Sequence, residues 1–181
     1  MTVKLSIRVA LLSAMTLLLL ASSQSSFAAD IYVQASIDQA GQLRIVTGNG
    51  REIVPRKDAE QVGFEKPAIS QDGGAVGWLA LYPNCCTSYP IPLKLMVLSN
   101  GRMRTFTGNG LPLWQWSFQS SGKRVAFRQE TVHGGIGTHY ELRDVATGRL
   151  IATHNPAVGP DNQPLAIQDV PTWVEALNAK Q

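Results

Sequence analysis

Residues 41–50, GQLRIVTGNG, return almost unchanged at residues 101–110, GRMRTFTGNG. In each copy an alternating apolar segment follows a glycine and ends in Thr-Gly-Asn-Gly. A third stretch beginning at Gly148, GRLIATHNPA, keeps the alternation but loses the Gly-Asn-Gly. Glycine and asparagine supply the positive φ that tight hairpins need, and the residues before each leading glycine also read as a strand. The repeat therefore predicts β-hairpins at Gly41, Gly101 and Gly148.

A second kind of segment lies between these hairpins. AISQDGGAVGWLAL, at residues 68–81, aligns with SFQSSGKRVAFRQE, at residues 117–130, when their glycine turns are superimposed. In both, a polar turn precedes an apolar strand, expected over residues 75–81 and 124–128. The complete unit then has four antiparallel strands, as a propeller blade does. We therefore expect an all-β fold of blade-like antiparallel sheets.

These segments also resemble a known repeat. SQDGGAVGW (70–78) and SSGKRVAF (120–127) are similar to the Ser-Pro-Asp-Gly-Lys-x-Ile-Ala-Phe core of TolB-like, WD40-like β-propeller repeats. YELRDVATGRL (140–150) is similar to the strand and turn that follow in the same repeats. The resemblance covers residues 67–154 well and residues 30–50 in part. It implies an incomplete or open propeller, and it implies no activity because such folds serve many functions.

The pattern divides the chain into a leader and one β-repeat domain over residues 29–181. Its expected parts are a half unit at 30–50, full units at 67–107 and 113–154, and a C-terminal strand and helix at 164–178. Closed propellers have about four blades or more, so this set either stays open or is completed by a second copy of the chain. The tail VPTWVEAL, with a short helix beginning at Pro171 or Thr172, is a candidate cover for an open sheet edge.

The first residues predict export. A positive region containing Lys4 precedes an apolar run at residues 9–20, and a small-x-small cleavage pattern, Ser-Phe-Ala, ends at Ala28. A second cut is expected one residue later. The run is shorter than the roughly 20 residues of a membrane span. Residues 1–28 are thus expected to be a signal peptide, and the mature protein to be periplasmic or secreted and not membrane-spanning.

Removal of the leader changes the charge balance. Lys4 and Arg8 leave with it, so 14 of the 16 Lys and Arg residues remain against 13 Asp and Glu, a net charge near +1. The remaining basic residues are scattered along the chain. Nucleic-acid binding therefore has no electrostatic support. We expect the partner to be an envelope protein or a small ligand.

Two loops carry the residue types that chemistry would use. Cys85 and Cys86 have no third cysteine to pair with, so they form a vicinal disulfide, remain a structural loop pair, or bond to another chain. His133 and His139 lie in TVHGGIGTHY, the equivalent loop of the next unit. Equivalent loops of neighbouring blades project from the same face. We therefore expect the two cysteines, the two histidines and Tyr89 to form one surface.

Two interpretations of that surface stay open. In the first, the loops bind a partner or ligand, and the protein is a binding or scaffold module of the cell envelope without a cofactor. In the second, the thiols and imidazoles hold zinc or copper, or the thiols carry out redox chemistry. A hydrolase is not indicated because the sequence lacks a Gly-x-Ser-x-Gly elbow. No catalytic residue can be assigned.

Aromatic residues suggest a further surface. The set that could line a groove is Trp78, Tyr82, Tyr89, Trp114 and Trp116. The tryptophans of LWQWSF, at residues 113–118, are two residues apart, so they belong to one face of a strand. That spacing favours core packing over a binding platform.

We expect the exported protein to begin at Ala29 or Asp30. Replacing residues 17–20 with charged residues should abolish export, because the leader then lacks the apolar run that identifies a signal peptide. N-terminal sequencing of the exported material locates the cut. An exported chain that still begins at Met1 would contradict the assignment.

Overall fold

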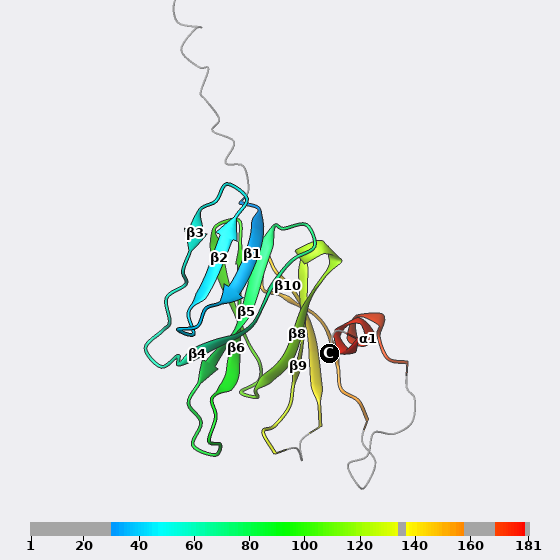
Figure 1. The fold of residues 1–181 in the computed structure, drawn as a ribbon. Helices are drawn as coiled ribbons and strands as arrows, with labels where there is room; N and C mark the ends of the chain where they lie inside the picture. Colours follow the sequence, from blue (N-terminus) through cyan, green and yellow to red (C-terminus); the bar gives the residue numbers. More distant parts are fainter. Residues whose placement is uncertain (1–29, 134–136, 158–168, 180–181) are drawn as a thin grey trace, which may run out of the picture.

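The computed structural model describes residues 30–133, 137–157 and 169–179 (Figure 1). The expected signal peptide at 1–28 lies outside these residues, and so does most of the C-terminal strand expected before the helix. The described chain is mostly β, as predicted, with three antiparallel sheets and a short C-terminal helix. No helix in these ranges is long and apolar enough to span a membrane.

We label the sheets A, B and C in chain order. Sheet A contains β1 (Tyr32–Ile37), β2 (Leu43–Thr47) and β3 (Glu52–Ile53). Sheet B contains β4 (Gly63–Ile69), β5 (Ala75–Tyr82), β6 (Ile91–Ser99) and β7 (Arg102–Thr107). Sheet C contains β8 (Leu113–Gln119), β9 (Arg124–Gln129), β10 (His139–Asp144) and β11 (Leu150–His154), with a 3-10 turn at Ser120–Gly122 between β8 and β9. Helix α1 is Thr172–Asn178.

All three predicted hairpins are present. Gly41, Gly101 and Gly148 join β1 to β2, β6 to β7 and β10 to β11, and their φ angles are 72°, 68° and 77°. Left-handed backbone of this kind favours glycine because it has no Cβ. The hairpin prediction is confirmed.

The two Thr-Gly-Asn-Gly strings both form turns, but they lead to different places. Gly50 and Gly110 have positive φ angles of 82° and 79°. The second string leaves β7, the last strand of sheet B, as expected. The first leads into β3, so sheet A has a third strand that the half-unit interpretation omitted. Sheet B also begins at Gly63 rather than at residue 67.

Strand β5 explains how the sheets stack. Val76 and Trp78 pack with residues of sheet A in one apolar cluster. Ala75 and Leu79, on the opposite face of the same strand, pack with residues of sheet C in another. Because successive side chains alternate between faces, β5 reads as a continuous apolar run with both faces buried. The layers follow in the order A, B and C, with α1 beyond sheet C (Figure 1).

The C-terminal helix covers the outer face of sheet C. Val174 and Leu177 are buried in a cluster with Ala126, Tyr140 and Leu142, on the face turned away from sheet B. The tail was expected to cover a sheet edge, and instead it covers a sheet face. An apolar face, unlike an edge, needs a side-chain partner rather than backbone hydrogen bonds.

The outer face of sheet A carries charged side chains where sheet C has a helix. Arg44 projects from β2 on the side opposite the buried Leu43, and its guanidinium pairs with Asp38 at 2.8 Å and with Glu52. Terminal repeats of stacked proteins characteristically carry such a polar outer face. The stack therefore ends in charged pairs on one side and in a helix on the other.

A polar clamp holds the connector between sheets A and B. The Asp58 carboxylate accepts hydrogen bonds from Tyr82 Oη at 2.6 Å and from Lys94 Nζ at 2.8 Å. These bonds, that of Lys94 first, lower the pKa of Asp58 to about 2. The charged carboxylate thus persists over the ordinary pH range and ties the connector to β5 and β6.

We expect Gly77→Ala to destabilise the fold by about 1–3 kcal/mol, as overpacking of a core does. A Cβ at this position of β5 would lie 2.6 Å from the Trp116 ring of sheet C and 3.2 Å from the Met96 carbonyl oxygen. Urea unfolding measures the change. The control is Gly137→Ala, where no atom lies within 4 Å of the added Cβ. Equal stability of the two variants would contradict close contact between sheets B and C.

Candidate functional site

The adjacent cysteines form an exposed turn after β5. The Sγ atoms of Cys85 and Cys86 lie 2.8 Å apart. The Asn84 side chain shapes the turn, because it accepts a hydrogen bond from the Cys86 N–H and donates one to Thr87. The hydrogen bond with Cys85 is the main cause of a raised Cys86 pKa. The turn therefore brings together two thiols that an extended strand would point apart.

The two histidines have different environments. His133 is exposed in the loop after β9, whereas His139 is the first residue of β10 and not part of that loop. The His139 Nδ1 faces Asn155, and its Nε2 lies 3.2 Å from the buried Glu141 carboxylate. Arg143 also donates to Glu141. His139 is thus engaged by its own sheet, which corrects its assignment to the loop.

The predicted loop surface is brought together only in part. Both loops reach the same end of their sheets (Figure 1), and Tyr89 is exposed in the first of them. Across the described residues, however, no three His, Cys, Asp or Glu side chains are grouped as metal ligands. Cys85, Cys86, His133 and His139 are therefore not grouped as one ligand set in the described chain, and the zinc or copper site stays a prediction.

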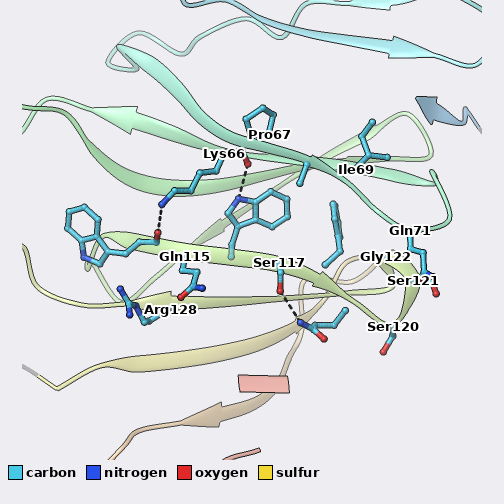
Figure 2. A pocket seen from close by; sticks show the side chains of 15 residues that line it. Lys66, Pro67, Ile69, Gln71, Gln115, Ser117, Ser120, Ser121, Gly122 and Arg128 are labelled. Carbon is cyan, nitrogen blue, oxygen red and sulfur yellow. Dashed lines mark hydrogen bonds between the residues drawn. The ribbon is translucent and has the colours of Figure 1, made fainter. Parts of the chain in front are cut away.

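A hollow of about 980 Å³ lies between sheets B and C (Figure 2). It is lined by residues 66–69, 71, 114–122 and 128, and we call it the β4–β8 groove. Strands β4 and β8 are edge strands of their sheets. Two hydrogen bonds cross between them: Lys66 Nζ donates to the Trp114 carbonyl at 2.7 Å, and Trp116 Nε1 donates to the Lys66 carbonyl at 3.1 Å.

The aromatic residues separate into core and groove. Trp78 and Tyr82 are buried in sheet B. Trp116 is 8 % exposed, which confirms the core packing predicted for it, although its side chain also borders the groove. Trp114 is only half-buried. A register shift between Leu113 and Gln115 places a bulge at Trp114, so strict alternation fails there. Its indole lines the groove and donates to the Glu130 carbonyl at 3.0 Å.

The charge of the groove is one-sided. Lys66 and Arg128 line it, and no carboxylate is among the lining residues that the structure describes. Figure 2 shows Lys66, Gln115 and Arg128 near one end, whereas Gln71 and the 3-10 turn at Ser120–Gly122 lie at the other. The groove therefore has a cationic end and a polar, uncharged end.

Two buried polar atoms at the cationic end lack partners. They are Arg128 Nε and Gln115 Oε1, and they are two of the four such side-chain atoms in the described chain. Another polar atom of each side chain does have a neighbour. Gln115 Nε2 donates to the Leu177 carbonyl at 2.6 Å, and Arg128 Nη2 lies 3.9 Å from the Glu130 carboxylate. Buried polar groups are almost always paired, so each exception requires an explanation.

The backbone around the groove is also unusual. Lys66, Ser120 and Ser121 have φ angles of 50°, 50° and 51°. Left-handed backbone costs a non-glycine residue about 1–3 kcal/mol and gathers at functional sites. Among the described residues the fourth non-glycine residue of this kind, Asn100, belongs to a hairpin turn, where asparagine is common. Ser120 and Ser121 lie in the turn that joins β8 to β9, so among these four residues only Lys66 is left-handed outside a hairpin.

The sequence patterns did not predict this site. Alternation along β9 places Arg128 on the same face as Arg124, and no sequence rule singles out Gln115, which pairs with Arg128 across the two strands. Lys66 precedes a proline inside a strand, and proline in a strand is a bulge or edge signal. That dipeptide was the one available sign of an irregular β4.

Comparison with known proteins adds little. No protein-family model matches the chain, and no curated protein is similar to it in sequence. Among solved structures it is similar to hydrazine synthase of Kuenenia stuttgartiensis, at 19 % identity and a TM-score of 0.42. The alignment covers 74 % of this chain and 38 % of that one. A likeness this distant carries no functional argument.

Proposed function

We propose that the protein is an exported binding module of the cell envelope and that the β4–β8 groove is its binding surface. The observation that carries the proposal is the hollow itself, which is lined by the half-buried Trp114, the Lys66 side chain and the hydroxyl groups of the turn at Ser120–Gly122. These groups offer a ligand an aromatic ring, a positive charge and hydrogen-bonding partners in one place.

The lining favours binding over catalysis. Its residues include hydroxyls and amides, but among those described there is no histidine, cysteine or carboxylate. A hydroxyl nucleophile needs an adjacent general base, and a positioned side chain of those types usually provides it. The groove therefore presents hydrogen-bonding groups and charge to a ligand without a catalytic pair.

The resemblance to TolB-like propeller repeats supports the same location. Propeller sheets surround a central channel. Strands β4 and β8 begin sheets B and C and border one hollow. In an open propeller, this hollow would occupy the place of the channel. We place the mature protein in the periplasm or outside the cell, on the basis of the leader at residues 1–28.

Tryptophan indole signals test the location of binding. In ¹⁵N-labelled protein titrated with small acids, amines and amides, we expect the Trp114 and Trp116 Nε1–H signals to shift. Both groups border the groove. Trp78, buried on the side of sheet A, is the internal control. Ligands that shift only the backbone amide signals of the loop at residues 83–90 would contradict the proposal.

Thiol redox chemistry is a second candidate, favoured by the exposed Sγ atoms that lie 2.8 Å apart. In exchange with a disulfide-bearing partner, a bond would form between the Sγ atoms of Cys85 and Cys86. The partner disulfide would accept two electrons and two protons and leave as two thiols. No third cysteine of the chain competes for either sulfur.

Mass spectrometry tests this second function. Incubation with oxidised glutathione should lower the mass by about 2 Da and remove both free thiols, because an intrachain disulfide forms by loss of two hydrogens. Cys85→Ser is the matched control, since its single thiol can form only a mixed disulfide. A wild-type protein that keeps two free thiols, or forms only disulfide-linked dimers, would rule the vicinal bridge out.

A further inference from the structure

The Cys85–Cys86 turn is also suited to chemistry that involves no change of oxidation state. Both thiols are exposed, and their Sγ atoms lie 2.8 Å apart. We propose that the reduced pair binds a trivalent arsenic compound, with one arsenic–sulfur bond to each cysteine. The inference is separate from ligand binding in the β4–β8 groove, and it concerns the two thiols before any disulfide has formed.

The two thiols converge because the chain turns between them. Adjacent side chains of an extended strand point to opposite faces. Here the Asn84 side chain accepts a hydrogen bond from the Cys86 N–H at 3.3 Å and donates one to Thr87 Oγ1 at 3.2 Å. Thr87 Oγ1 donates in turn to the Tyr89 carbonyl at 2.6 Å. The two sulfurs therefore lie together before a ligand arrives, which lowers the entropy cost of binding.

The turn supplies two sulfur ligands and no others. Across the described residues no three His, Cys, Asp or Glu side chains are grouped for a metal, and residues 83–90 contain no histidine and no charged residue. Zinc takes four protein ligands in structural sites and three in catalytic ones. The pair alone is therefore a poor zinc site, whereas thiolate ligands in general select soft ions.

The spacing of the sulfurs distinguishes among soft ions. At metal–sulfur bonds of about 2.3 Å, an ion with linear coordination, such as two-coordinate Cu(I), holds its two sulfurs roughly 4.6 Å apart. Trivalent arsenic is pyramidal, with bonds near right angles, so at a similar bond length its two sulfurs are roughly 3.3 Å apart. The observed 2.8 Å is closer to the second value. A smaller opening of the turn therefore admits arsenic.

Charge favours the same assignment. A dithiolate of Cu(I) keeps one negative charge, which no side chain of the loop at residues 83–90 offsets. The hydrogen bond with Cys85 raises the pKa of Cys86, so this sulfur carries its proton at neutral pH. In the reaction with an R–As=O compound, both S–H bonds and the bonding of arsenic to oxygen break, two As–S bonds form, and one water leaves with both protons. The product is neutral, and arsenic remains trivalent.

Phenylarsine oxide tests the assignment, because its phenyl group leaves arsenic only two positions for sulfur. The protein is first reduced and its two free thiols are counted. Mass spectrometry of the intact protein should then show a single adduct, heavier than the protein by the arsenical less one water. The adduct should persist in excess glutathione, a monothiol, and be removed by 2,3-dimercaptopropanol, a dithiol.

Variants of the loop separate chelation from ordinary thiol reactivity. Cys85→Ser and Cys86→Ser should each bind at least about 100-fold more weakly, because the second As–S bond no longer forms within the molecule at a high effective concentration. Ser88→Ala, an exposed change in the same loop, should leave binding unchanged. Cys86→Ser combined with Ser88→Cys keeps two thiols but moves one of them out of the turn, and it should bind more weakly than the wild type.

Each outcome decides the assignment. A persistent wild-type adduct that both single-cysteine variants lose supports it. It is overturned if glutathione displaces the arsenical from the wild type as readily as from those variants, or if the relocated cysteine pair binds as tightly as the adjacent one. The two proposed functions are judged separately: the Trp114 indole signal reports the groove, and incubation with oxidised glutathione reports disulfide formation.

Discussion

The Trp116 side chain sets the distance between sheets B and C, and the groove depends on that distance. Its ring occupies the space that Gly77 leaves open on β5, where a Cβ would lie 2.6 Å from the ring. Its Nε1–H satisfies the Lys66 carbonyl on the edge of β4. Within the described residues the two sheets share no strand ladder, so they meet through side chains. Trp116 takes part in both kinds of contact, because it packs against β5 and donates one of the two hydrogen bonds between β4 and β8.

The rest of the stack follows from faces that must be covered. Strand β5 is buried on both sides, and this requires a sheet on each side of it. Sheets A and C then each have one outer face that no other sheet covers. Arg44 forms its ion pairs on the outer face of sheet A, and Val174 and Leu177 of α1 cover the outer face of sheet C. Stability is thus spread over successive neighbouring interfaces, an arrangement that stacked-repeat proteins also have.

The parts of this fold that are local in sequence could be predicted, and the parts that join distant segments could not. The hairpins at Gly41 and Gly101 were predictable because turn chemistry depends on two or three adjacent residues. Alternation also identified Trp116 as a core residue. It could not show that Gln115 would meet Leu177, a residue 62 positions away, or that a bulge would turn Trp114 out of the core. The site residues were missed because alternation predicts the face of a strand but not what lies against it.

The same irregular backbone that borders the groove also bears on what can enter it. An open strand edge invites another strand, and proteins block such edges with bulges, lysines and prolines. Strand β4 has all three at one place: its register shifts between Glu65 and Ala68, with Lys66 left-handed and Pro67 lacking an N–H. Strand addition at this edge, by a peptide or by a second copy of the chain, would lack a continuous ladder. The hollow beside it therefore stays open to a ligand that is held by side chains.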